Sequence, residues 1–152
     1  MNKLQGKGRV IDLIMRRNQI EKMDLIMSLN NLRVSYSEIE KNIDSNIQEF
    51  QGLMQTVACT MGNNQLLDPL LWHERMQYAQ ELQHIKKGLV DRANLLGSEI
   101  KNLERKVEIL TAKEKSLEQK RLSVKKEIVL WRLKIEENAL SDLYATHPIR
   151  SS

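Results

Sequence analysis

The sequence predicts an all-α fold, a long antiparallel two-helix coiled-coil hairpin, and three observations support this prediction. Apolar residues recur at alternating steps of three and four along both halves of the 152-residue chain. Residues that stop helices gather in one short stretch, at 61–69. Charged residues make up 29% of the chain, whereas only six Gly, two Pro and one Phe are present. We therefore expect one domain over 1–152, without a wide apolar core.

The predicted bend lies in the sequence MGNNQLLDP, at 61–69. Gly62 and the two asparagines after it can end a helix, and Asp68 can cap the next helix with Pro69 in its first turn. The other proline, Pro148, belongs to a tail that no helix should enter. The predicted elements are a helix over about 5–60, a turn over about 61–68, a helix over about 69–145 and a short disordered tail over 146–152.

Each predicted helix carries a seam of apolar residues with heptad spacing. In the second helix the seam includes Leu96, Ile100, Leu103, Val107, Leu110, Leu117, Val124, Ile128, Trp131 and Ile135. Glu114 and Arg121 interrupt this same stripe with charge. The seam of the first helix includes Leu25, Leu29, Leu32, Tyr36, Ile39, Ile43, Ile47, Phe50, Met54, Val57 and Met61. The two seams are predicted to hold the helices together.

Both seams contain two consecutive steps of four, a stutter that locally unwinds a coiled coil. The stutters fall at Ile39, Ile43 and Ile47 in the first helix and at Ile85, Leu89 and Ala93 in the second. Folding the chain back about a centre near residue 66 places Ile43 opposite Leu89. The two stutters are therefore predicted to lie at the same height of one hairpin.

The second helix is predicted to extend beyond the first. In the register centred near residue 66, Leu4 reaches about as far as Ile128, so Trp131 and Ile135 protrude. A large aromatic side chain on such an extension should be buried in a partner or covered by the N-terminal residues, and the sequence leaves both alternatives open.

Basic residues concentrate in the two segments that hairpin folding brings together. Residues 1–35 carry seven basic and three acidic side chains, and residues 101–135 carry eleven and five. Residues 36–100 have a net charge of −4. The basic end could bind an acidic protein surface, nucleic acid or an anionic membrane, although part of it pairs with nearby glutamates. No aromatic-rich motif or broad apolar face accompanies it, so we expect neither nucleic-acid binding nor membrane insertion.

The sequence contains no pattern typical of an active site. Phosphate-binding glycine loops, HExxH and paired-cysteine motifs are absent, and the three histidines are isolated. Cys59 is the only cysteine and is expected to be a small apolar filler. We therefore expect no enzyme, no catalytic or metal residue and no cofactor. The absence of a signal peptide and of a membrane-spanning run favours a cytoplasmic location.

The bend, the segment LLWHERMQYAQELQHIKK at the start of the second helix and the late segment KKEIVLWRLKIEENALSDLY carry a family resemblance. With its longer C-terminal helix and basic end, the chain resembles the central stalk proteins of type III secretion systems, the FliJ/YscO (SctO) family. The resemblance implies a monomer within a virulence or flagellar secretion complex at the inner membrane. Its partners would be a hexameric secretion ATPase, an export-gate ring protein and secretion chaperones.

On this resemblance, two sets of residues are expected to contact partners. The ATPase-facing set is Arg9, Arg16, Arg17, Lys125, Lys126 and Arg132. The export-gate-facing set is Trp72, Met76, Ala79 and Gln83. Two other classes stay open: a coiled-coil adaptor or chaperone-like scaffold for a small helical partner, and a homodimeric or filamentous coiled coil.

Overall fold

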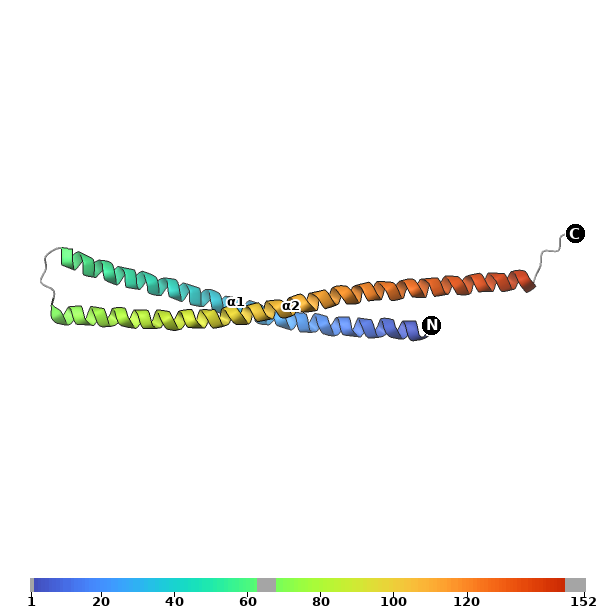
Figure 1. Cartoon of the computed structure of the whole chain (residues 1–152), viewed down its shortest axis with the longest axis horizontal. Coiled ribbons are helices and arrows are strands. Elements are labelled where there is room, and N and C mark those ends of the chain that lie inside the picture. Colours follow the sequence, from blue (N-terminus) through green and yellow to red (C-terminus); the bar gives the residue numbers. More distant parts are fainter. Residues whose placement is uncertain (1, 63–67, 147–152) are drawn as a thin grey trace. The chain divides into compact units, whose positions relative to one another are not determined.

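The computed structural model describes residues 2–62 and 68–146 and places them in two long helices (Figure 1). Helix α1 spans Asn2–Gly62 and helix α2 spans Pro69–Thr146. No strand occurs in these described ranges, and the two helices pack against each other, so the predicted all-α hairpin is confirmed. The predicted turn residues 63–67 and the tail from 147, including Pro148, lie outside the described residues.

The start of α2 is fixed by Asp68, as the sequence predicts. The backbone N–H of Leu70 donates a hydrogen bond to Oδ1 of Asp68 at 3.1 Å. The backbone N–H of Trp72 donates to the Asp68 carbonyl oxygen at 3.0 Å. Pro69 occupies the first helical position, where its missing N–H costs nothing. Asp68 is therefore the N-cap of α2.

The contacts of the hairpin divide into two compact units, each an antiparallel pair of helical segments. The terminal unit consists of Met1–Leu25 and Lys106–Ser152, and the bend unit consists of Ile26–Arg105. In the bend unit the buried apolar side chains are Leu29, Ile39, Val57, Ala79, Leu82 and Ala93. In the terminal unit they are Leu110 and Val124. Burial is thus confined to a single line of side chains along each unit, which we call the seam.

The predicted stutter in the first helix is wrong, because a polar residue continues the heptad spacing there. Asn46 is buried, with 7% of its surface exposed, and its Nδ2 donates a hydrogen bond to the carbonyl oxygen of Leu82 at 3.1 Å. The seam of α1 therefore follows unbroken steps of three and four through Ile43, Asn46, Phe50, Leu53 and Val57. A satisfied amide can occupy an interior position that an unpaired one could not.

The stutter predicted in the second helix is also wrong, for a related reason. Ile85 is 52% exposed, and Lys86 is the half-buried residue in its place. The seam therefore runs Leu82, Lys86, Leu89 and Ala93 without a repeated step of four. Lysine tolerates such a position because its methylene stem packs against apolar neighbours while its ammonium group reaches water.

The predicted register of the hairpin agrees with the contacts inside each unit. A centre near residue 66 places Asp12 level with residue 120 and Asn46 level with residue 86. In the structure Asp12 contacts Arg121, and Asn46 contacts Leu82, one helical turn away. The fold centre deduced from the seams is therefore correct to within about one turn of helix.

Candidate partner-binding surfaces

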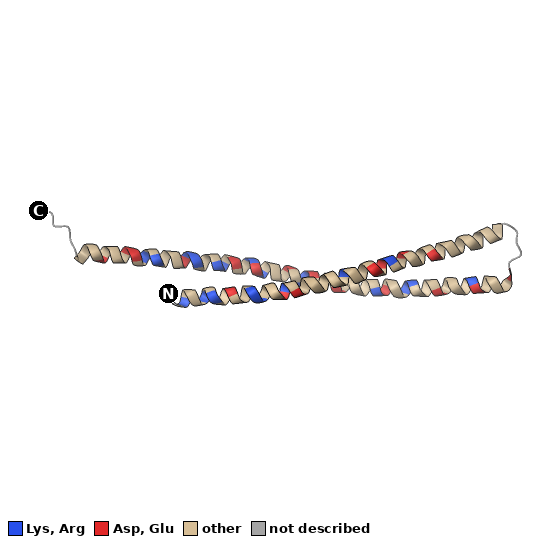
Figure 2. Cartoon of the chain, turned by 180° about the vertical axis from the view of Figure 1, so that it is seen from behind, with Lys and Arg blue, Asp and Glu red and all other residues tan. Residues whose placement is uncertain are grey.

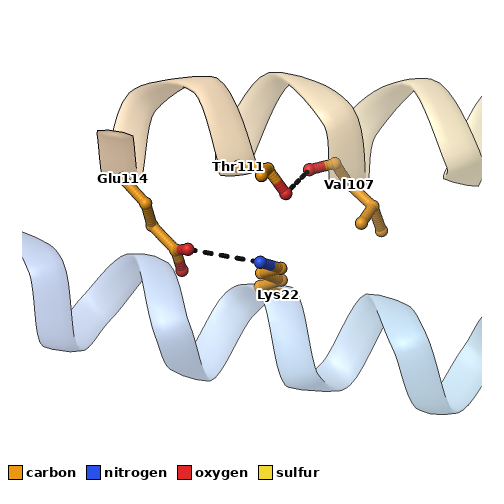
Figure 3. A network of polar contacts seen from close by, with 4 residues as sticks. All are labelled: Lys22, Val107, Thr111 and Glu114. Atoms are coloured by element: carbon orange, nitrogen blue, oxygen red, sulfur yellow. Dashed lines mark hydrogen bonds and ion pairs between the residues drawn. The ribbon is translucent and has the colours of Figure 1, made fainter. Parts of the chain in front are cut away.

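A charged pair crosses the seam of the terminal unit. Nζ of Lys22 on α1 lies 3.2 Å from Oε2 of Glu114 on α2 (Figure 3). The two side chains are 25% and 23% exposed, so water reaches them only in part. One turn earlier on α2, the Thr111 hydroxyl donates a hydrogen bond to the Val107 carbonyl at 2.8 Å (Figure 3). The charge that interrupts the predicted seam at Glu114 is thus compensated by α1.

The second predicted interruption, Arg121, is paired in the same way. Its Nε lies 3.4 Å from Oδ1 of Asp12 on α1, and its Nη1 lies 3.7 Å from Oε2 of Glu118 on its own helix. Both carboxylates are about half exposed, so these contacts contribute little to folding stability. They do remove Arg121 from the charge available to a partner.

The six residues predicted to face an ATPase all belong to the terminal unit, and all are exposed. In the part of the chain that the structure describes, none of the six forms an ion pair within 4.0 Å. In Figure 2 the ribbon segments coloured blue, which mark Lys and Arg, recur along both helices of this unit. We call this set the basic surface: Arg9, Arg16, Arg17, Lys125, Lys126 and Arg132.

The two units differ in net charge. The terminal unit carries sixteen Lys and Arg against ten Asp and Glu, a net charge of +6. The bend unit carries eight against ten, a net charge of −2. The predicted concentration of positive charge in the unit that contains both chain ends is therefore present in the structure.

Two members of the basic surface meet at a hollow beside Gly8. This residue occupies a seam position where other residues would place a side chain, and a Cβ there would lie 3.9 Å from Cγ1 of Val124. The hollow is lined by Gln5, Gly8, Arg9, Asp12, Arg121, Val124, Lys125 and Ile128. The structure thus brings Arg9 and Lys125 to one place. Arg16, Arg17, Lys126 and Arg132 lie outside this hollow.

The end of α2 extends beyond its contacts with α1. Trp131 is half-buried, and every residue over 132–146 is exposed, Ile135 at 44%. In Figure 1 the N-terminus of α1 lies beside α2 well before α2 ends. The predicted extension is therefore confirmed, with Trp131 at its boundary rather than fully protruding.

The set predicted to face an export gate needs one correction. Trp72 and Met76 are half-buried and Gln83 is exposed, but Ala79 is only 6% exposed. Ala79 occupies a seam position of α2 and packs against α1, so no partner can contact it in this hairpin. The neighbouring seam residue Arg75 has a buried Nη1 without a hydrogen-bond partner among the described residues.

One polar contact on the surface of the bend unit was not predicted from the sequence. The hydroxyl of Tyr78 donates a hydrogen bond to Oε2 of Glu49 at 3.0 Å. This bond, and then the negative charge of Glu49, raise the pKa of Tyr78 above its usual value. No spacing rule within one helix could have paired these residues, because they lie on different helices.

A second apolar stripe on α2 also escaped the sequence analysis. It lies on the face turned away from the seam and consists of Leu122, Val129, Leu130, Leu133, Leu140, Leu143 and Tyr144, which are 50–67% exposed. We call it the outer stripe. Its signal was present in the sequence, since positions 122, 129, 133, 140 and 144 follow steps of seven and four. We overlooked this pattern because several of its positions, such as 122 and 129, directly follow seam positions in the sequence.

Comparison with protein-family models, curated proteins and solved structures gives no match to this chain. Neither helix, over its described residues, contains an apolar run that could cross a bilayer. Over those same residues, no group of three or more His, Cys, Asp or Glu side chains is placed to hold a metal ion. The basic surface, the outer stripe and the side chains near the bend are features that the described residues offer to a partner.

Proposed function

We propose that this protein is the central stalk of a type III secretion apparatus, which links and stimulates a hexameric secretion ATPase and contacts the export gate. The observation that carries the proposal is the exposed basic surface on the terminal unit, which forms no ion pair within the described ranges, together with a helix end that extends beyond its partner helix. The family resemblance in the sequence supplies the identity of the partners. The protein would act in the cytoplasm at an inner-membrane complex and would catalyse no reaction itself.

The charge distribution suits a shaft that must turn inside a ring. Exposed Lys and Arg side chains attract acidic groups at a distance, but each exposed pair stabilises a complex by about 1 kcal/mol or less. Contacts of this strength can favour one ATPase subunit over the next without locking either. In this proposal the basic surface enters the ring, and the bend unit, with its net charge of −2, remains outside.

The export-gate contact would use the side chains near the bend that remain accessible. Trp72 and Met76 expose part of their apolar surface. Gln83 is exposed about two turns of helix beyond Met76 on α2. Ala79 is not part of this surface, because it packs against α1. The gate contact in this proposal is therefore a small patch of mixed apolar and polar character.

The test measures ATP hydrolysis by the cognate secretion ATPase with and without this protein, at low and high salt. We expect a rise in hydrolysis that high salt weakens, because exposed charges are screened. The double variant Arg16→Glu/Arg17→Glu should lose most of this rise. Lys41→Glu/Lys87→Glu, two exposed charge reversals within the bend unit, is the matched control and should retain it.

Unchanged hydrolysis with an ATPase that is active alone would overturn the stalk proposal. A coiled-coil adaptor that binds one small helical partner, such as a secretion chaperone or substrate, would then be the better account. If both charge-reversal variants lose the stimulation of ATP hydrolysis equally, the stimulation depends on the net charge of the protein and not on the basic surface.

A further inference from the structure

The outer stripe leaves a large apolar surface without a contact in the hairpin. Seam residues of the same segment, such as Val124 at 9% exposed, are covered by α1, whereas Leu130 on the outer stripe is 64% exposed. Such a surface on one face of a helix is typical of a site that binds another helix. Leu122, Val129 and Leu130 line a shallow hollow with Lys125 and Lys126.

The seam itself ends where the outer stripe continues. Beyond Ile135, the next seam positions are Asn138 and Asp142, which are polar and exposed. Over the same turns the outer stripe places Leu140, Leu143 and Tyr144 on the opposite face. The last turns of α2 therefore offer no surface for a helix packed like α1, but they offer one for a helix on the other side.

The charges around the outer stripe change sign at its middle. Residues 122–134 contain four basic side chains and one acidic one, whereas residues 135–146 contain three acidic side chains and no basic one. Two copies of such a segment in antiparallel orientation can place Lys125 and Lys126 of one copy near Glu136 and Glu137 of the other. Because a twofold interface uses the same surface on both subunits, this pattern is complementary to itself.

We infer that the outer stripe pairs antiparallel with the outer stripe of a second copy of this chain, forming a twofold dimer of intact hairpins. In a register centred on residue 131, Leu122 of each copy meets Leu140 of the other. Val129 meets Leu133 in the same register, with Leu130 next to it in the sequence. Five of the seven apolar residues of the stripe thus fall opposite one another, whereas Leu143 and Tyr144 extend past Leu122 of the other copy.

The polar residues inside the stripe also match in this register. Lys126 of one copy faces Glu136 and Glu137 of the other, on each side of the twofold axis. The chain already uses this arrangement between its own helices, where Lys22 and Glu114 pair at 3.2 Å within an apolar seam (Figure 3). An antiparallel pair of α2 ends would repeat that arrangement twice.

The size of the outer stripe predicts a weak dimer. Residues 122–144 span about 34 Å of helix. A single helix pair of this length lies at or below the small end of specific interfaces, which bury about 1,200–2,000 Å². The association is therefore reversible and depends on salt, and it requires neither an ATPase nor an export-gate protein. It uses Lys126, so the dimer and the proposed ATPase-bound form exclude each other.

The test is sedimentation equilibrium of the full chain over protein concentrations from low to high micromolar. The wild type should shift from monomer to dimer in this range. Lys126→Glu should weaken association about tenfold or more, because like charges then face one another on both sides of the twofold axis. Glu136→Lys/Glu137→Lys should do the same. An equimolar mixture of the two variants should associate again, since each restores the opposite charge to the other.

Three outcomes separate this dimer from its alternatives, with circular dichroism confirming that every variant is still helical. A wild-type chain that stays monomeric at all concentrations overturns the inference and leaves the outer stripe to a different protein. A dimer that neither charge reversal weakens, or variants that do not associate when mixed, overturn it as well. Because no ATPase is present, failure here is distinct from failure of the proposed stalk function.

Discussion

Asn46 and Leu82 join the two helices of the bend unit through a side-chain amide and a backbone carbonyl, 3.1 Å apart at the seam. The amide occupies a position of the kind that apolar residues fill along most of α1, and it is 7% exposed. Polar residues at single interior positions of coiled coils commonly specify register at a cost in stability. The contact therefore selects one alignment of α1 against α2.

Two replacements of Asn46 should show how much its hydrogen bond contributes to the free energy of unfolding. Asn46→Ala removes the hydrogen bond and should lower the free energy of unfolding by about 1 kcal/mol. Asn46→Leu fills the seam and should leave stability unchanged or raise it, because a buried apolar side chain contributes more than a buried amide. Urea denaturation measures both effects, and Asn42→Ala, at an exposed position of α1, is the control. An Asn46→Ala protein as stable as wild type would contradict this role.

The ion pair of Lys22 and Glu114 should show a measurable coupling. Both side chains are about one-quarter exposed, so screening by water is incomplete but still reduces the effect. A double-mutant cycle to alanine should give a coupling of about 0.5–1 kcal/mol. The matched pair Arg33 and Glu104 is more exposed, at 54% and 44%, and should couple more weakly. Equal coupling in the two pairs would mean that burial at the seam does not matter.

Tyr78 should titrate at a higher pH than an isolated tyrosine. Its hydrogen bond to Glu49 and the charge of that residue raise its pKa from 10.0. Because the folded-state pKa lies above the unfolded one, this contact stabilises the fold at pH values below about 10 and ceases to do so as Tyr78 deprotonates. The difference between alkaline absorbance titrations of wild type and Tyr78→Phe isolates this group. Glu49→Gln should lower the pKa of Tyr78, and an unchanged value would exclude Glu49 as its cause.

Removal of residues 129–152 should separate folding from partner binding. The removed part contains half-buried Trp131 and the exposed residues 132–146, so the remaining hairpin loses few internal contacts and should stay helical by circular dichroism. On the proposed function, stimulation of the ATPase should fall. The dimer should also disappear, because most of the outer stripe is removed. Unchanged stimulation would show that the extension is not the docking element.

Much of the fold follows from the sequence because its determinants are local. Heptad spacing of apolar residues is a property of each helix alone, and it predicts both helices and the confirmed extension of α2. The cap at Asp68 depends on residues only two and four positions away. The approximate register followed from one assumption, a fold centre near residue 66.

The errors arose where a polar residue replaced an apolar one at the seam. An apolar pattern alone predicts stutters through Ile47 and Ile85, whereas the structure continues the heptads through Asn46 and Lys86. Their suitability depends on partners or on solvent access, which sequence spacing does not reveal. Ala79 was misplaced on a binding surface because the seam of α2, followed from Leu82 toward the bend, passes through it.

The shallow burial along the seams has a further consequence for how each unit opens. Among the described residues, no side chain is less than 2% exposed, so water lies close to every layer of either unit. No central layer then holds the remaining layers in place, and each adds a small, separate increment to stability. Such an assembly unfolds progressively from its ends, one layer of side chains at a time. The rate of amide hydrogen exchange should therefore increase gradually toward the N-terminus of α1. No stretch of uniformly slow exchange, as in a globular core, is expected.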